Sequence, residues 1–144
     1  MLRGNSETKV DEKGRLKIPA TFKKVFDEVF PESKFFVTSL EGKSALIYPL
    51  QEWIKVEEKF KSSFDPLMTD LKHRVNYWGG EAEMDTQGRI LMPQVLREHL
   101  KMQGEVSVMG MTSYLEVYTA EKAKQRAERE FTPDEWAKLE QRGI

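Results

Sequence analysis

Hydrophobic and polar residues alternate over a short segment near the N-terminus of this chain. Leu16 and Ile18 alternate with Arg15 and Lys17, which is the period-two pattern of a strand that has one buried face and one solvent-facing face. The pattern predicts that Leu16 and Ile18 lie in the core. Arg15 and Lys17 are then expected to point outward together.

The same segment occurs twice. Residues 10–19 read VDEKGRLKIP, and residues 84–93 read MDTQGRILMP, an offset of 74 that keeps the Asp, Gly, Arg and Pro positions. A second match, of LIYP at 46–49 with EVYT at 116–119, has an offset of 70, so the second copy lacks four residues between its motif and its last strand. Internal repetition of this kind fixes the architecture, and two copies of one structural unit are predicted.

Each copy contains a predicted tight turn, which we call the first turn (residues 11–15) and the second turn (residues 85–89). Asp11 and Gly14, and likewise Asp85 and Gly88, occupy the first and fourth positions of a type I turn, with the glycine at positive φ. A turn between two strand patterns predicts a hairpin. The four residues are therefore expected to support the D-x-x-x-R motif that ends in Arg15 or Arg89.

A helix is predicted after each motif, because Pro19 and Pro93 end their strands and suit the first turn of a helix. Its apolar residues recur at helical spacing and are expected in the core: Phe22, Val25, Phe26, Val29 and Phe30 in the first copy, Leu96 and Leu100 in the second. Further strands are predicted at 34–39 and 45–48, and at 105–110 and 114–118. Each unit is then β-turn-β-α-β-β.

Helices are also predicted between the copies and after them. One spans about 50–60, and the next begins after an N-cap at Asp65 and carries an apolar stripe of Leu67, Leu71, Val75 and Trp78. After a polar helical segment at 120–130, Thr132 to Glu135 reads as a capping box that starts a short, mostly exposed helix. We divide the chain into a first repeat (1–53), a helical connector (54–80), a second repeat (81–124) and a helical tail (125–144).

The composition and the charge distribution exclude several classes of functional site. The chain has 144 residues and no cysteine, which excludes disulfides, thiolate zinc sites and cysteine nucleophiles. It has no long apolar run and no apolar leader, so we expect a cytoplasmic protein. The net charge is −1, yet residues 1–25 carry seven basic and three acidic side chains. A basic end on an acidic body is compatible with phosphate binding, and equally with an ordinary solvated surface.

The two arginines are the main candidate binding residues. A guanidinium group can donate two parallel hydrogen bonds to a phosphate or to the O6/N7 edge of guanine. The alternative is that Arg15 and Arg89 only pair with Asp11 and Asp85 across their own turns, and the two interpretations can coexist.

The copies differ in the residues around these arginines. Lys13, Lys17 and Lys24 are replaced by Gln87, Leu91 and Glu98, while Lys23 is retained as Arg97. We therefore expect the first copy, with Lys13 and Lys17, to be the better phosphate partner. An outward Leu91 is either a contact between protomers or an isolated surface leucine.

The sequence matches enzyme motifs only incompletely. His73 and His99, the only histidines, fall in different predicted helices and beside the core stripes, which favours surface or boundary roles. Gly42-Lys43-Ser44 lacks the earlier glycine of a phosphate-binding loop and reads as a hairpin turn. Ser6 to Lys9 fits S-x-x-K only formally. We expect no catalytic residue, no metal site and no cofactor.

Taken together, the segments MLRG, VDEKGRLKIPATFK, LIYPLQEW, MDTQGRILMPQVLRE and EVY, in this order, resemble the MraZ family over about residues 1–125. The resemblance implies an α+β fold, in which two AbrB-type repeats form an intramolecular pseudo-dimeric swapped-hairpin β-barrel with peripheral helices. It also implies homo-oligomeric rings, an octamer or larger, that bind double-stranded DNA in the cytoplasm and associate with the nucleoid. Arg15 and Arg89 take the place of the family's DNA-contacting arginines.

The resemblance further implies the regulatory target. Members bind G-rich direct repeats upstream of the division and cell-wall gene cluster that includes their own gene, and repress it in some bacteria. The expected function is thus a sequence-specific DNA-binding transcriptional repressor without catalytic activity. The alternative is a ring-forming scaffold that binds protein partners through the same basic hairpins.

Overall fold

Each copy of the repeat forms two strands, a helix and two further strands, in the predicted order. The structure is a computed structural model that describes all 144 residues. The first copy consists of β1 (Asn5–Val10), β2 (Arg15–Lys17), α1 (Ala20–Val29), β3 (Lys34–Thr38) and β4 (Ala45–Pro49). The second consists of β5 (Gly80–Glu83), β6 (Arg89–Leu91), α4 (Gln94–Leu100), β7 (Gly104–Gly110) and β8 (Leu115–Thr119). The residues missing from the second copy shorten its helix, since α1 has 10 residues and α4 has 7.

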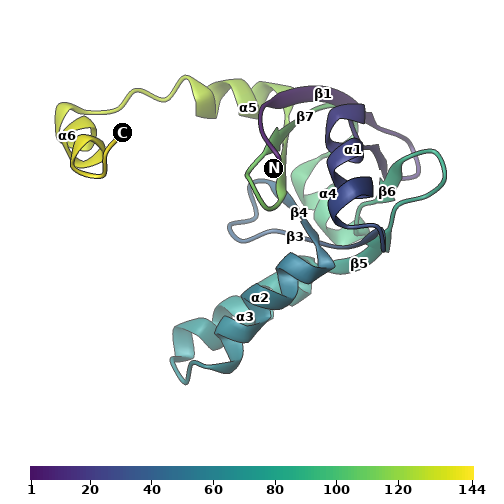
Figure 1. The fold of residues 1–144 in the computed structure, drawn as a ribbon, viewed down its shortest axis with the longest axis horizontal. Helices are drawn as coiled ribbons and strands as arrows, with labels where there is room; N and C mark the ends of the chain where they lie inside the picture. The colour runs from purple at the N-terminus through teal and green to yellow at the C-terminus, as the bar shows by residue number, and fades with distance from the viewer.

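The eight strands form one antiparallel sheet that curls into a nearly closed barrel, in the order β5-β3-β4-β8-β7-β1-β2-β6 (Figure 1). The two copies interlock in this sheet, because β1 pairs with β7, β2 with β6, β3 with β5 and β4 with β8. The predicted α+β barrel is confirmed. The predicted hairpin is only local, since β1 and β2 share the single pair Val10 and Leu16 before each strand joins a partner from the other copy.

The barrel core is built from both copies. A cluster of 20 buried residues includes Leu16 and Ile90 from the paired strands β2 and β6, together with Phe22 and Phe26 of α1 and Leu96 of α4. Burying one such side chain contributes about 1.5–3 kcal/mol. The prediction for Val29 was wrong. It is exposed, because α1 ends at this residue and the following Phe30 fills the core instead.

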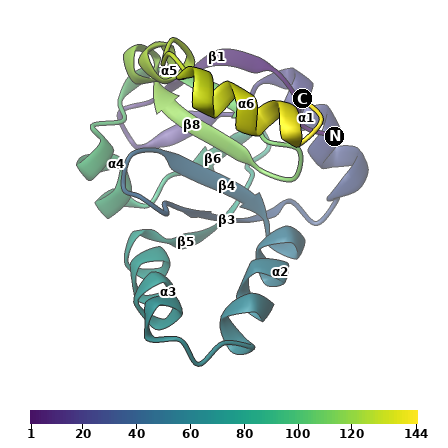
Figure 2. The same ribbon diagram turned by 90° about the vertical axis from the view of Figure 1, so that its left-hand side faces the viewer.

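Two connector helices, α2 (Leu50–Lys61) and α3 (Pro66–Trp78), project from the barrel as a helical hairpin (Figure 1 and Figure 2). A small second cluster joins them to β3, where the Phe36 ring stacks on Trp53 with centroids 4.7 Å apart. Asp65 is the predicted N-cap and accepts a hydrogen bond from the backbone N–H of Leu67. The stripe prediction was wrong for Leu67, which is 72% exposed because it lies at the tip of the hairpin, where α2 and α3 extend away from the barrel.

The chain ends in two helices, α5 (Ala120–Ala127) beside the barrel and α6 (Pro133–Gln141), which lies apart from it in Figure 1. The predicted capping box is present, since Thr132 accepts from the backbone N–H of Glu135 and Glu135 accepts from that of Thr132. Trp136 is exposed, as expected of this tail. None of the helices combines the length and the apolar character needed to cross a membrane.

Candidate nucleic-acid interface

The first turn is closed by its aspartate. The backbone N–H of Gly14 donates to the carbonyl oxygen of Asp11 over 3.0 Å, and Gly14 has a φ of 84°, a region that residues with a Cβ rarely adopt. The carboxylate Oδ1 of Asp11 accepts from the backbone N–H groups of Lys13 and Arg15, over 3.0 and 2.9 Å. One side chain therefore fixes the whole loop between β1 and β2.

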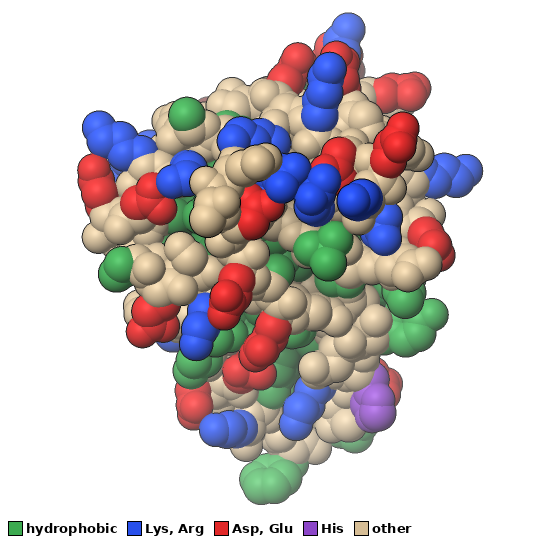
Figure 3. All heavy atoms as spheres, turned by 90° about the vertical axis from the view of Figure 1, so that its right-hand side faces the viewer, with side chains coloured by type: hydrophobic (Ala, Val, Ile, Leu, Met, Phe, Trp, Pro, Cys, Tyr) green, Lys and Arg blue, Asp and Glu red, His purple; other side chains and the backbone are tan.

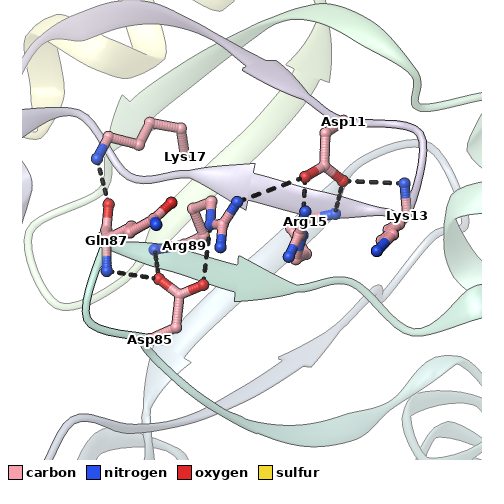
Figure 4. Close-up of polar contacts among 7 residues, drawn as sticks. All are labelled: Asp11, Lys13, Arg15, Lys17, Asp85, Gln87 and Arg89. Atoms are coloured by element: carbon pink, nitrogen blue, oxygen red, sulfur yellow. Dashed lines mark hydrogen bonds and ion pairs between the residues drawn. The ribbon is translucent and has the colours of Figure 1, made fainter.

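The second turn repeats this geometry (Figure 4). Gly88 donates to the Asp85 carbonyl over 3.0 Å and has a φ of 75°. Asp85 Oδ1 accepts from the backbone N–H groups of Gln87 and Arg89, each over 2.9 Å. The predicted turns and the positive φ of both glycines are confirmed.

Each arginine is held by the aspartate of its own turn. Arg15 Nε lies 2.8 Å from Asp11 Oδ2, and Arg89 Nε lies 2.9 Å from Asp85 Oδ2. The terminal nitrogens of both guanidinium groups make no hydrogen bond, and their only ion pair joins Arg89 Nη1 to Asp11 Oδ2 over 4.0 Å. The side chains are 32% and 25% exposed, so each arginine lies on the outer face with most of its side chain covered. Two terminal donors on each remain available to a ligand.

The interlocked strands bring the two arginines onto one surface. In the β2–β6 pair, Arg15 lies opposite Leu91 and Lys17 lies opposite Arg89, while Leu16 and Ile90 pair on the buried face. Directly opposite residues of an antiparallel pair lie on the same face of the sheet. In Figure 4 the turns lie at opposite ends of the strand pair, with the arginines between them. We call this surface the arginine face, comprising Arg15, Lys17, Arg89 and Leu91.

The position of Leu91 changes its interpretation. It is 55% exposed and lies directly across from Arg15, at one end of the arginine face. A neighbouring protomer that covered Leu91 would also cover Arg15 and block any ligand of the guanidinium. We therefore expect Leu91 to be an exposed apolar contact beside the arginines, and a contact between protomers stays the alternative.

The cations beside each turn come largely from the other copy. Lys17 Nζ donates to the carbonyl oxygen of Gln87 in the second turn (Figure 4). A Cβ built on Gly88 would lie 3.2 Å from Lys23 Cδ and 3.5 Å from Lys17 Nζ, so both lysines pack against the second turn. The pairing of β2 with β6 therefore places Lys17 beside the second turn and not beside the first, while the better phosphate partner of the two copies stays a prediction. Lys13 is exposed within its own turn.

Arg97 is the counterpart of Lys23 and packs against the first turn. A Cβ at Gly14 would overlap the guanidinium group of Arg97, which comes from α4 of the second copy. Sequence reasoning identified Lys23 and Arg97 as matched positions without giving them a role. The signal was present, because a basic residue is kept there in both copies while the adjacent Lys24 becomes Glu98.

Both carboxylates are stabilised in their charged form. The hydrogen bond from the backbone N–H of Arg15 is the largest cause that lowers the pKa of Asp11; partial desolvation opposes it, and the Arg15 guanidinium lowers the pKa further. The pKa of Asp85 is lowered in the same way, first by the backbone N–H of Arg89. Each aspartate thus remains an anion that can orient its arginine at neutral pH.

The side of the molecule drawn in Figure 3 shows lysine and arginine side chains gathered over the barrel, with acidic side chains among them.

The other residues considered as candidate sites in the sequence lie away from the arginine face. Nε2 of His99 is 2.9 Å from the carbonyl oxygen of Gly42, and its ring lies against Trp78. Gly42 to Ser44 connects β3 and β4, as predicted for a hairpin turn. His73 is exposed on α3. No group of three or more histidine or acidic side chains has a metal-binding arrangement.

Comparison with known proteins gives a consistent result. The family described as "MraZ protein, putative antitoxin-like" matches residues 1–74 and 80–133. A relative named Transcriptional regulator MraZ from Acidobacterium capsulatum is 54% identical over 130 residues, which cover 89% of this chain and 88% of the relative.

Other relatives carry the same name. The protein from Koribacter versatilis is 43% identical over the full length of both chains. That from Haemophilus influenzae is 32% identical, over 83% of this chain and 80% of the relative. With both D-x-x-x-R turns in place on one interlocked barrel, the chain belongs to the MraZ family.

Proposed function

We propose that this protein is a sequence-specific DNA-binding transcriptional regulator, not an enzyme, and that Arg15 and Arg89 read its DNA. The observation that carries the proposal is the pair of guanidinium groups on one face, each oriented through Nε by its own aspartate and each with terminal nitrogens that make no hydrogen bond. Two parallel N–H donors match the O6 and N7 acceptors of guanine in the major groove. Relatives named as transcriptional regulators support the regulatory role.

The other predicted site residues support these two. Asp11, Gly14, Asp85 and Gly88 hold the turns, so that the arginines are pre-oriented before DNA arrives. Pre-orientation lowers the entropic cost of binding. The exposed ammonium groups of Lys13 and Lys17 are assigned to the phosphate backbone, which positions the protein without selecting a sequence.

Membership of the family supports a finer proposal. The DNA target is a set of G-rich direct repeats upstream of the division and cell-wall gene cluster that includes the protein's own gene, and binding there represses transcription. The protein acts in the cytoplasm, on the nucleoid, as a ring-shaped homo-oligomer of eight or more copies. Support for assembly comes from exposed apolar side chains on the connector hairpin: Ile54, Phe64, Leu67 and Tyr77. Such exposure is typical of an interaction surface.

Fluorescence anisotropy with a labelled duplex from upstream of the gene tests the proposal. Wild-type protein is expected to bind this duplex at least a hundredfold more tightly than a scrambled one at physiological salt, and to lose affinity as salt rises. Arg15→Ala should weaken the preference, and Arg15→Ala combined with Arg89→Ala should abolish it, while light scattering shows unchanged assembly. Equal affinity for both duplexes, or none for either, would leave the protein-binding scaffold as the better account.

A further inference from the structure

One buried polar side-chain atom in the whole protein lacks a hydrogen-bond partner, and it is Nε of Arg97. Buried polar groups are nearly always paired, so an exception points to strain or to a partner that arrives later. Arg97 is also absent from the ion pairs of the structure, although Glu98 lines the same hollow of about 300 Å³. Its charge is therefore not neutralised by a direct protein contact.

The unpaired group lies directly at the first turn. The guanidinium of Arg97 packs on the backbone of Gly14, the residue that precedes Arg15. An arginine side chain has several rotatable bonds, so rotation about them can move the guanidinium off the glycine and expose Nε. Together with a terminal nitrogen, Nε then forms the two-pronged donor that binds a phosphate.

The equivalent residue of the first copy behaves differently. Lys23 packs against Gly88 of the second turn in the same way, but its ammonium lies 2.7 Å from Asp27 of the same helix. The charge of Lys23 is therefore partly neutralised before any ligand binds. In addition, the ammonium group is a single point charge, whereas a guanidinium group can donate two parallel hydrogen bonds. The two positions are related by the repeat and differ in their capacity for an anion.

We propose that Arg97, which belongs to the second repeat, contacts the DNA backbone beside Arg15 of the first turn. The proposal rests on the proposed function and adds a contact residue to it. In the free protein Arg97 covers Gly14. On DNA its guanidinium turns outward and binds the phosphate next to the base that Arg15 reads, and Lys23 is the weaker counterpart beside Arg89.

The side chains that line the hollow beside Arg97 favour a DNA phosphate over a free phosphate ion as the ligand. Asp11, Glu12 and Glu98 line it together with Lys101. These three carboxyl groups outnumber the two cations and disfavour a small free anion. A duplex is held in place by the arginine face as a whole, so its phosphate can reach Arg97 from the outer side. The ligand is thus a DNA phosphate and not free phosphate.

The salt dependence of binding tests the contact. Each phosphate contact contributes about 0.9 to the slope of log affinity against log salt concentration. Arg97→Gln should reduce this slope by about that amount for each protomer on the duplex, and should weaken binding about three- to tenfold at physiological salt. Lys24→Gln removes a charge from the exposed side of α1 and should leave the slope within about 0.3 of the wild-type value. Millimolar inorganic phosphate, at matched ionic strength, should not compete.

Double variants test whether Arg97 acts together with the turn of the other repeat. Residues that share one contact region give non-additive effects, whereas separate sites add. Combined with Arg15→Lys, Arg97→Gln should lose less affinity than the sum of the two single losses, and combined with Arg89→Lys the losses should add. Lys23→Gln should show the reverse pairing. These measurements are made at low salt, so that weakened variants still bind.

The outcomes separate the possibilities. An unchanged slope in Arg97→Gln, even with weaker binding, would mean that Arg97 only supports the turn, and would overturn the proposal. Competition by inorganic phosphate that disappears in Arg97→Gln would overturn it in favour of a free-anion site. If Arg97→Gln does not fold, Arg97→Met, which keeps an apolar stem over Gly14, carries the same expectation. Absence of wild-type binding would instead refute the proposed function itself.

Discussion

The first and second turns have the same internal geometry but different surroundings. In each, the aspartate accepts from two backbone N–H groups and from Nε of its arginine, with distances that agree within 0.1 Å between the turns. Around them, Arg97 packs on the first turn, and Lys17 and Lys23 pack on the second. The local motif therefore fixes the turn, whereas the opposite repeat determines the charge beside it.

This comparison reverses an expectation based on chain position. Counting neighbours along the sequence gives the first copy Lys13, Lys17 and Lys23, and leaves Arg89 without lysines. The pairing of β2 with β6 exchanges these neighbours, so that Arg89 lies opposite Lys17. The two arginines are thus expected to contribute similarly to DNA binding, and the following changes test or refine that equivalence.

The largest effect is expected from removing both arginines. Each bidentate contact with a base contributes about 1–3 kcal/mol, and Arg15→Ala with Arg89→Ala removes both from every protomer. Sequence preference should disappear and leave only salt-sensitive, non-specific binding. Anisotropy with specific and scrambled duplexes measures this, and light scattering serves as the control for assembly. A preference that survives in the double variant would mean that bases are read elsewhere.

Leu91→Asp should have the next largest effect. A carboxylate opposite Arg15 competes for its guanidinium and repels the phosphates of an approaching duplex, so affinity should fall at least tenfold. Leu91→Asn, polar but neutral, should lose less. Because Leu91 lies on the arginine face, the mass of the assembly should not change in either variant. Dissociation of the oligomer in Leu91→Asp would restore the interpretation of a protomer contact.

The glycines of the turns should differ in the cost of substitution. Both have positive φ, where a side chain costs about 1–2 kcal/mol. Gly14→Ala must in addition displace the guanidinium of Arg97, while Gly88→Ala meets the flexible chain of Lys23 at 3.2 Å and Lys17 Nζ at 3.5 Å. In urea denaturation, Gly14→Ala should therefore be the more destabilised of the two. Equal midpoints would mean that displacing the guanidinium of Arg97 does not change the free energy of unfolding.

The smallest effect is expected from mild acid. A lowered carboxylate pKa contributes stability that is present above the unfolded-state value, about 3.9, and is lost as the pH falls through the folded-state value. The pKa values of Asp11 and Asp85 are both lowered, so the two turns should respond alike and remain intact from pH 7 to 5. Asp11→Asn and Asp85→Asn should each differ from wild type in urea by an amount that is constant over this range and shrinks below pH 4. A loss that begins near pH 6 would contradict the assignment.

The sequence predicted what depends on local chemistry. The spacing of Asp11 and Gly14 determined the turn, and the alternation around Leu16 determined which side chains face outward. It did not predict the neighbours of Lys17 and Arg97, because these depend on pairing between strands more than 70 residues apart. Val29 and Leu67 fit the helical period yet are exposed, since periodicity cannot show where a neighbouring element ends.

The equivalence of the two arginines is tested most directly by comparing Arg15→Ala with Arg89→Ala on one duplex and on derivatives with single guanine substitutions. We expect losses of affinity within about threefold of each other, and each variant should lose discrimination at a different guanine. If Arg89→Ala binds like the wild type and keeps discrimination at every guanine, one turn reads the DNA alone, and the account of two equivalent turns is wrong.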